Sequence, residues 1–171
     1  YEIVGSYRRG KKMSGDIDVI ITSKDQGIFN RFFDLLKETN VIAEVLSKGN
    51  TKSMVIGKLN ENSTARRIDF MYTPPDEYPY AILYFTGSKA FNTVMRSHAL
   101  KQNISLNEHG MYEKTKGKEK GKKIEKLMNS EQDIFDELGL KYQEPEKRTD
   151  GTAVKLLNNE AITKIFHFGR A

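Results

Sequence analysis

The sequence predicts an α+β fold in two subdomains, and three observations lead to that prediction. Short runs of β-branched and aromatic residues, which are typical of strands, recur between residues 1 and 72. Among them, residues 25–39 carry apolar side chains at helical spacing. The pair Pro74–Pro75 then interrupts the chain, because proline cannot continue a backbone ladder, and further helix-like and strand-like stretches follow it.

For the first subdomain, residues 1–74, we expect a mixed or antiparallel sheet with a helix packed on it. The expected strands are residues 2–4, 19–21, 41–46, 54–59 and 67–72. In the last of these strands Ile68 and Phe70 alternate with Asp69, so Asp69 should lie on the opposite face of the sheet from its two neighbours.

For the second subdomain, residues 75–148, we expect a helix over 88–101 and a strand over 104–112. Ser130 and Asp133 have the spacing of a helix N-cap pair, and Gly139 is placed to end that helix. Residues 149–171 form a C-terminal extension to which we assign no role. An amphipathic helix in this extension would use Ala153, Val154, Leu157, Ile162 and Ile165.

Composition limits the chemistry that is open to the chain. Its 171 residues include no Cys and only three His, so thiolate and histidine-rich metal sites are improbable and carboxylates are the natural ligands. Carboxylate ligands suit Mg²⁺ or Mn²⁺. A net charge of +5 and a pI of about 9.2 are consistent with nucleic-acid binding without establishing it.

No apolar stretch is long enough to cross a bilayer and no signal peptide opens the sequence, so we expect an intracellular protein without a membrane partner. The first residue is Tyr1 rather than Met, and residues 2–4 already read as a strand. We therefore expect that upstream sequence is missing.

Two carboxylates stand directly before the apolar run Val19-Ile20-Ile21. Residues i and i+2 of a strand share a face, so Asp16 and Asp18 should project together and repel each other unless a cation lies between them. A polar turn at the start of a strand would give the same short pattern. With Asp69 on another strand, however, three carboxylates could hold two divalent ions. The alternative for Asp69 is a strand residue held in a salt bridge.

The segment before these carboxylates has the residues of a phosphate-binding turn. Backbone N–H groups after Gly5, the Ser6 hydroxyl and the Arg9 guanidinium could surround a phosphate. Gly15 would let the backbone approach closely just before Asp16. A basic loop with a structural glycine is the alternative interpretation.

Together these motifs resemble a known family. Gly5-Ser6-x-x-Arg9-Gly10 followed by Gly15-Asp16-x-Asp18 resembles the signature of the nucleotidyltransferase superfamily. Arg66–Asp69 and Leu83–Ser88 look more narrowly like DNA polymerases of family X, the DNA polymerase beta group, and the likeness covers roughly residues 4–148. The resemblance implies a nucleotidyltransferase palm followed by a small α/β thumb.

The resemblance also implies roles for individual residues. In the palm, Asp16, Asp18 and Asp69 would be the catalytic ligands of two Mg²⁺ ions, for which Mn²⁺ could substitute. The triphosphate of the incoming nucleotide would be held by Ser6, Arg9 and Gly15. Arg67 would contact DNA.

In the thumb, the resemblance implies that the sugar of the nucleotide lies against Tyr84, Phe85 and Gly87. Asn92 and Arg96, four residues apart on one helix face, would test the minor groove of the new base pair from the nucleotide side and the template side respectively. Glu108 would belong to the network that closes the subdomain.

The sequence also departs from the family pattern. Lys89 stands where an acidic residue is usual and His109 where a tyrosine is usual, which puts fidelity and closure in doubt but not the chemistry. The segment 114–123 has six Lys and one Glu, and it can be a solvated loop or a contact to a phosphate backbone.

From these residues we expect a template-directed DNA polymerase that adds dNMP from dNTP to a primer 3′-hydroxyl. Its partners would be primer–template or gapped DNA and dNTP. The resemblance places it in gap-filling repair such as base excision repair, as a monomer, in a nucleus or in a viral or cytoplasmic setting. The alternatives are a template-independent nucleotidyltransferase acting on RNA or another acceptor, and an inactive DNA-binding module.

Overall fold

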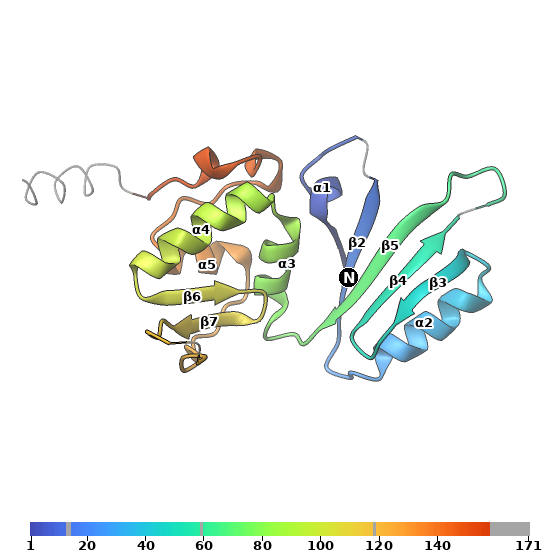
Figure 1. The fold of residues 1–171 in the computed structure, drawn as a ribbon, viewed down its shortest axis with the longest axis horizontal. Helices are drawn as coiled ribbons and strands as arrows, with labels where there is room; N and C mark the ends of the chain where they lie inside the picture. The colour runs from blue at the N-terminus through green and yellow to red at the C-terminus, as the bar shows by residue number, and fades with distance from the viewer. Residues whose placement is uncertain (13–14, 59, 118, 158–171) are drawn as a thin grey trace, which may run out of the picture.

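The chain forms two subdomains joined near Pro74 and Pro75 (Figure 1). The structure is a computed structural model that describes residues 1–12, 15–58, 60–117 and 119–157. We call residues 1–74 the palm and the described residues from 75 onward the thumb. The predicted α+β class is confirmed.

The palm is built on a five-stranded sheet with the order β1-β2-β5-β4-β3. Its strands are β1 (Glu2–Val4), β2 (Asp16–Thr22), β3 (Ile42–Lys48), β4 (Lys52–Gly57) and β5 (Arg66–Thr73). β2 and β5 pair in parallel, and the other neighbours pair antiparallel. All five strands lie where the sequence predicts them, with ends that differ by a few residues.

Helices cover both faces of this sheet, as Figure 1 shows. α2 (Ile28–Glu38) buries Phe29 and Phe33 against apolar residues of one face. α3 (Tyr78–Thr86) packs Ala81 and Ile82 against the other face, in a cluster completed by Val4, Ile20 and Met71. Successive strand residues point to opposite faces, so each strand supplies side chains to both layers.

The thumb has a second apolar core. Its elements are α3, α4 (Lys89–Lys101), β6 (Ile104–Asn107), β7 (Gly110–Glu113), α5 (Glu131–Glu137) and the 3₁₀ turns Pro145–Lys147 and Gly151–Ala153. α5 begins as predicted, because the Ser130 hydroxyl accepts from the Asp133 N–H, and it ends before Gly139 at φ 67°. Fully buried side chains of this core include Phe91, Met95, Ile134, Phe135 and Leu138.

The structure differs from the sequence prediction in three places. The single strand expected over 104–112 is a hairpin, with β6 and β7 joined by Glu108 and His109. α3 was not predicted, because its apolar residues surround the whole helix and leave no amphipathic period. α3, which follows the proline pair, contributes to both cores, and the sequence did not predict that sharing.

The expected helix of the C-terminal extension is wrong for the part that the structure describes. Residues 151–153 form a 3₁₀ turn and Val154 is extended, so no amphipathic helix begins there. Leu156 instead forms a β-bridge with Leu140, and Ala153 is buried in the thumb core. Residues 149–157 are therefore part of the thumb, while Ile162 and Ile165 lie outside the described residues.

A cluster of buried charges, which we call the junction cluster, joins palm and thumb. It consists of Arg8, Glu131 and Arg148. Arg8 donates to both carboxylate oxygens of Glu131 at 3.0 and 2.5 Å, and Arg148 donates to the same carboxylate at 2.6 Å. Arg148 is fully buried beside three aromatic rings. One carboxylate thus lies between two guanidinium groups of different subdomains.

Candidate active site

The three predicted carboxylates lie on one face of the palm sheet. β2 and β5 are adjacent and parallel, and Asp18 stands directly opposite Asp69 in their register. Asp16 lies two residues before Asp18 and therefore on the same face. This is also the face that α3 covers farther along the strands, through Ile20 and Met71. The register thus brings together carboxylates that are about 50 residues apart in sequence.

Charge is poorly balanced on this face. Burial first, and then the neighbouring carboxylates Asp69 and Asp16, raise the pKa of the Asp18 carboxyl above its ordinary value. Arg67 is the neighbouring cation with resolved contacts: it donates to both oxygens of Asp69, at 3.0 and 3.2 Å. The hydrogen bond to Asp69 in turn raises the pKa of the Arg67 guanidinium.

The residues present can accommodate divalent cations, although the set is not closed. Gly5 has φ 70°, and a Cβ atom there would lie 2.9 Å from an oxygen of Asp18, so only glycine keeps that space open. Within the described ranges, no group of three or more Asp, Glu, His or Cys side chains converges as a ready-made metal site. Arg67 donates to both oxygens of Asp69, so this carboxylate would have to give up at least one of these hydrogen bonds to bind a metal ion.

The predicted phosphate cradle lies beside these carboxylates. α1 (Gly5–Arg8) follows β1 and directs Arg9 toward the thumb, where its guanidinium donates to the Thr86 carbonyl oxygen at 2.5 Å. Burial lowers the pKa of Arg9. Among the described residues other than its chain neighbours, none lies within 4 Å of a Cβ atom built on Gly15.

The Arg9 contact brings the cradle to the aromatic pair at the end of α3. The rings of Tyr84 and Phe85 meet edge to face, with centroids 5.0 Å apart. Phe85 packs on the apolar cluster between α3 and the sheet, whereas Tyr84 lines a pocket of the thumb. Gly87 follows at φ 66°, and a Cβ atom there would lie 3.1 Å from the Arg9 guanidinium. The peptide bond after Gly87 is cis.

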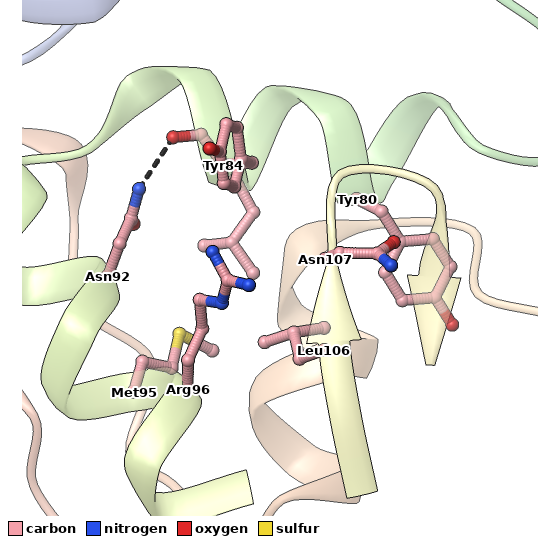
Figure 2. A pocket seen from close by; sticks show the side chains of 8 residues that line it. Tyr80, Tyr84, Asn92, Met95, Arg96, Leu106 and Asn107 are labelled. Carbon is pink, nitrogen blue, oxygen red and sulfur yellow. Dashed lines mark hydrogen bonds between the residues drawn. The ribbon is translucent and has the colours of Figure 1, made fainter. Parts of the chain in front are cut away.

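The thumb pocket, which we call the base-pair pocket, contains both side chains predicted to test base pairing (Figure 2). Asn92 donates from its amide to the Tyr84 carbonyl oxygen at 2.7 Å, and the Arg96 guanidinium lies 5.8 Å from the centre of the Tyr84 ring. Asn107 lines the same pocket from the end of β6. The free space is only about 10 Å³, so these polar groups satisfy one another in this state of the protein.

Glu108 lies at the turn of the β6–β7 hairpin. Its carboxylate is 3.7 Å from Nε2 of His109, whose Nδ1 is 2.6 Å from Glu77. Glu77 immediately precedes α3, at the joint between the subdomains. His109 therefore connects Glu108 to this joint, which is the region where the sequence placed closure of the thumb.

Comparison with known families agrees with this geometry. Residues 1–75 match the family model for the DNA polymerase beta palm, and residues 81–149 match that for the DNA polymerase beta thumb. The two matches occur in the same order as the two subdomains: the palm match ends at the proline joint and the thumb match begins at residue 81, within α3. The chain belongs to the DNA polymerase beta family, family X.

Relatives within family X match across both subdomains. DNA polymerase lambda of Rattus norvegicus is 35% identical over 158 residues, which cover 84% of this chain and 28% of that protein. DNA nucleotidylexotransferase of Xenopus laevis is 30% identical over 186 residues, covering 85% of this chain and 36% of the relative. DNA polymerase lambda of Arabidopsis thaliana is 31% identical over 162 residues, covering 84% and 31%. The chain thus spans about a third of the length of these relatives.

Sequence reasoning did not identify several residues that shape this family X site. Arg8 and Glu131 connect α1 to the thumb, and Met54 contacts the Arg67 guanidinium through its sulfur at 2.9 Å. Arg8 is adjacent to Arg9 in the phosphate-binding motif, but its partner is 123 positions away.

Among the described residues, no helix is long and apolar enough to cross a membrane.

Proposed function

We propose that this chain is the catalytic part of a template-directed DNA polymerase, which transfers dNMP from dNTP to a primer 3′-hydroxyl, most naturally in a DNA gap. The observation that carries the proposal is the register of β2 and β5. It sets Asp18 opposite Asp69 and Asp16 on the same face of the sheet. Arg9, which follows α1, reaches the Thr86 carbonyl at the end of α3, and the base-pair pocket lies in the thumb.

Asp16, Asp18 and Asp69 would hold two Mg²⁺ ions, in keeping with the general use of divalent metals in family X. Bound there, such ions activate the attacking hydroxyl and stabilise the leaving pyrophosphate. The repulsion that Asp69 and Asp16 exert on Asp18 supports this assignment, as does the close packing of the Asp18 carboxylate on Gly5, which fixes its position. In the absence of cations Arg67 orients Asp69 through two hydrogen bonds.

Arg9 and Ser6 would bind the triphosphate. Arg9 is partly desolvated, and a guanidinium in such a setting binds phosphate oxygens more strongly than one in bulk water. It already reaches the end of α3, so a bound triphosphate would compete with the Thr86 carbonyl for the same donor. The nucleotide sugar would then lie against Tyr84, Phe85 and Gly87.

Asn92 and Arg96 would examine the new base pair. Both donate hydrogen bonds, and every correct pair presents acceptors in its minor groove, so the two residues would test geometry without reading sequence. In the structure the Asn92 amide donates to the Tyr84 carbonyl oxygen, and the pocket has no room for a base. A correct pair would have to displace this internal hydrogen bond, which makes pocket opening part of nucleotide selection.

A second function has support of its own. The likeness to a DNA nucleotidylexotransferase also covers both subdomains, so possession of this thumb does not by itself require a template. Untemplated addition of nucleotides to a DNA end is therefore the competing proposal. It would use the same three carboxylates. The difference is that the base-pair pocket would accept a nucleotide without a paired template base.

The experiment is nucleotide addition to a labelled primer in a gapped duplex and to the same primer as a single strand. Each dNTP is supplied separately with Mg²⁺. Templated synthesis gives addition of the complementary nucleotide in the gap, whereas the competing proposal gives addition to the single strand whatever the base. Asp69→Asn should lower the rate at least about 100-fold while DNA affinity is kept. Undiminished addition by Asp69→Asn would refute the metal assignment.

A further inference from the structure

The lysine-rich segment after β7 is the strongest charged feature that the proposed site does not use. We call residues 113–117 and 119–123 the basic loop. The side chains of Lys114, Lys116, Lys120 and Lys122 are exposed, and Lys123 is half-buried. Within the described residues, none of these five lysines is in an ion pair. Lys118 lies outside the described residues.

The basic loop has a defined backbone path. The Glu113 N–H donates to the Lys122 carbonyl oxygen at 2.8 Å, and the Lys114 N–H donates to Asn103 at 3.0 Å. The Thr115 hydroxyl donates across the loop to the carbonyl oxygen of Glu119 at 2.6 Å. These bonds fold the chain back on itself, so the lysines are presented from a folded turn.

Gly121 permits this return. A Cβ atom at that position would lie 1.8 Å from the Glu113 carbonyl oxygen, which no side chain could tolerate without displacing one limb of the loop. The limbs are therefore held together more closely than any other residue would allow. Lysines on such a loop lose less conformational freedom on binding an anion than lysines on a free tail.

Between the basic loop and β6 runs a groove of about 310 Å³. Its polar lining includes Ser105, Tyr112, Thr115, Lys114 and Lys120, together with the carboxylates Glu113 and Glu119. Asn107 lines this groove and also the base-pair pocket. The groove and the base-pair pocket thus both reach Asn107, and the groove lining adds hydroxyl and ammonium donors.

We propose that the basic loop binds phosphates of the template strand as this strand passes the base-pair pocket. The proposal rests on the proposed function, since Arg96 is what assigns the template to this side of the pocket. The primer end would lie at the palm carboxylates, in the other subdomain, so the strand that continues from Asn107 toward the loop is the template. Phosphodiester groups are spaced regularly along a strand, and unpaired lysines neutralise them without reading the bases.

The test compares two variants with the same change in charge. Lys114→Gln/Lys120→Gln removes both groove-lining lysines, and Lys24→Gln/Lys37→Gln removes two exposed lysines of the palm on or beside α2. DNA affinity is measured by fluorescence anisotropy on a primer–template over a range of salt concentrations. The slope of log affinity against log salt should fall in magnitude by about 0.7 for each template phosphate that is no longer neutralised if that part of the template is unpaired, or about 0.9 if it is paired. The palm variant should keep the wild-type slope.

Chemically modified DNA identifies the strand. Neutral methylphosphonate linkages in the template should abolish the difference between wild type and Lys114→Gln/Lys120→Gln, while the same linkages in the primer should leave it. A substrate without a template overhang separates the two sources of phosphate: loss of the difference indicates the unpaired template, and its persistence indicates the paired part. An unchanged slope, or sensitivity to primer linkages only, would overturn the proposal.

Failure of this inference can be told apart from failure of the proposed function. If wild type adds the complementary nucleotide but the slopes of all three proteins agree, the basic loop has no template role and the polymerase assignment is unaffected. If wild type adds no nucleotide while the template-dependent slope difference persists, the loop binds the template and the activity assignment fails. Gly121→Ala, which keeps the charge but disturbs the return of the loop, should reproduce part of the slope change.

Discussion

Two groups of charged side chains, one on the palm face and one at the junction of the subdomains, are organised in opposite ways. On the palm face three carboxylates share one neighbouring arginine with resolved contacts, Arg67. In the junction cluster one carboxylate, Glu131, lies between Arg8 and Arg148. In the first group the three carboxylates outnumber the nearby cations Arg67 and Lys52. In the second, the Glu131 carboxylate has two cationic partners, and Arg8 also lies 3.5 Å from Glu2.

The pKa values reflect this difference. Burial, Asp69 and Asp16 raise the pKa of Asp18 above its ordinary value. Burial alone would raise the pKa of Glu131 as well, but the hydrogen bonds and charges of Arg8 and Arg148 outweigh it and hold the value lower. A compensated cluster stabilises the joint of two subdomains, whereas an uncompensated one is suited to recruiting cations. The predictions below test this division, from the largest expected effect to the smallest.

Removal of the Glu131 carboxylate should have the largest effect on stability. Glu131→Ala would leave Arg148, which is fully buried, without its anion, and the loss should be about 3–5 kcal/mol of unfolding free energy. Urea unfolding at neutral pH measures it. The control is Glu137→Ala, whose carboxylate pairs with Lys126 at the surface and should contribute at most about 1 kcal/mol. Equal losses in the two variants would contradict the assignment.

Acid should remove part of the same stabilisation. Because the folded-state pKa of Glu131 is depressed, its contribution is complete above the unfolded-state pKa, near 4.5, and is lost as the pH falls through the lower folded value. Wild type should therefore lose stability below about pH 4.5 more steeply than Glu131→Gln. Urea unfolding of both proteins, repeated from pH 6 downward in steps of about one pH unit, would show this difference in the midpoints. Parallel curves would mean that Glu131 titrates alike in the folded and unfolded states.

Gly5 tests the space beside Asp18. In Gly5→Ala the new methyl group would meet an Asp18 oxygen at 2.9 Å, on a backbone at φ 70° that alanine adopts only at a cost of about 1–2 kcal/mol. We expect a modest loss of stability and a larger loss of nucleotide addition. Gly139→Ala has a similar φ of 67° but open surroundings, so it should lose stability without losing activity. If Gly5→Ala and Gly139→Ala lose activity equally, the effect at Gly5 does not come from its contact with Asp18.

Neutralising a palm carboxylate should have the smallest effect on stability. Asp18→Asn removes repulsion with Asp69 and Asp16, so the unfolding free energy should stay the same or rise by about 0.5 kcal/mol, while nucleotide addition is lost. Thermal unfolding in the absence of divalent cations is the measurement. A loss of more than about 1 kcal/mol would show that Asp18 supports the fold, and the contrast with Glu131 would disappear.

Local patterns predicted most of the fold. The run Val19-Ile20-Ile21 and the alternation around Asp69 predicted β2 and β5, and Ser130 with Gly139 predicted the limits of α5. In contrast, α3 could not be found from periodicity, because Tyr80 and Leu83 face one core while Ala81 and Ile82 face the other. The turn at Glu108 and His109 lacks the glycine–asparagine signal of a tight hairpin, so the local pattern predicts a continuous strand there.

The sequence placed the candidate site residues on their strands but did not predict all of their contacts. Asp16, Asp18 and Asp69 follow from strand patterns, yet their register depends on which strands pair, and that is settled by the whole sheet. Arg67 and Asp69 are two residues apart on one face of β5, so their ion pair is a local contact that the strand pattern could have indicated. The link from Arg8 to Glu131 joins groups 123 positions apart, and no local pattern pairs them. The hydrogen bond from Asn92 to the Tyr84 carbonyl oxygen likewise depends on how α3 and α4 pack together.

The shared position of α3 has a consequence for dividing this protein into parts. A palm cut after Thr73 would expose Val4, Ile20 and Met71, which Ala81 and Ile82 now cover. A thumb beginning at residue 75 would carry those same two side chains into water. Each half is a recognisable unit by descent, but neither can be expected to stay monomeric in isolation, since each would present an apolar surface made to receive the other. Each of the two family matches therefore covers a region whose apolar surface is completed by the other.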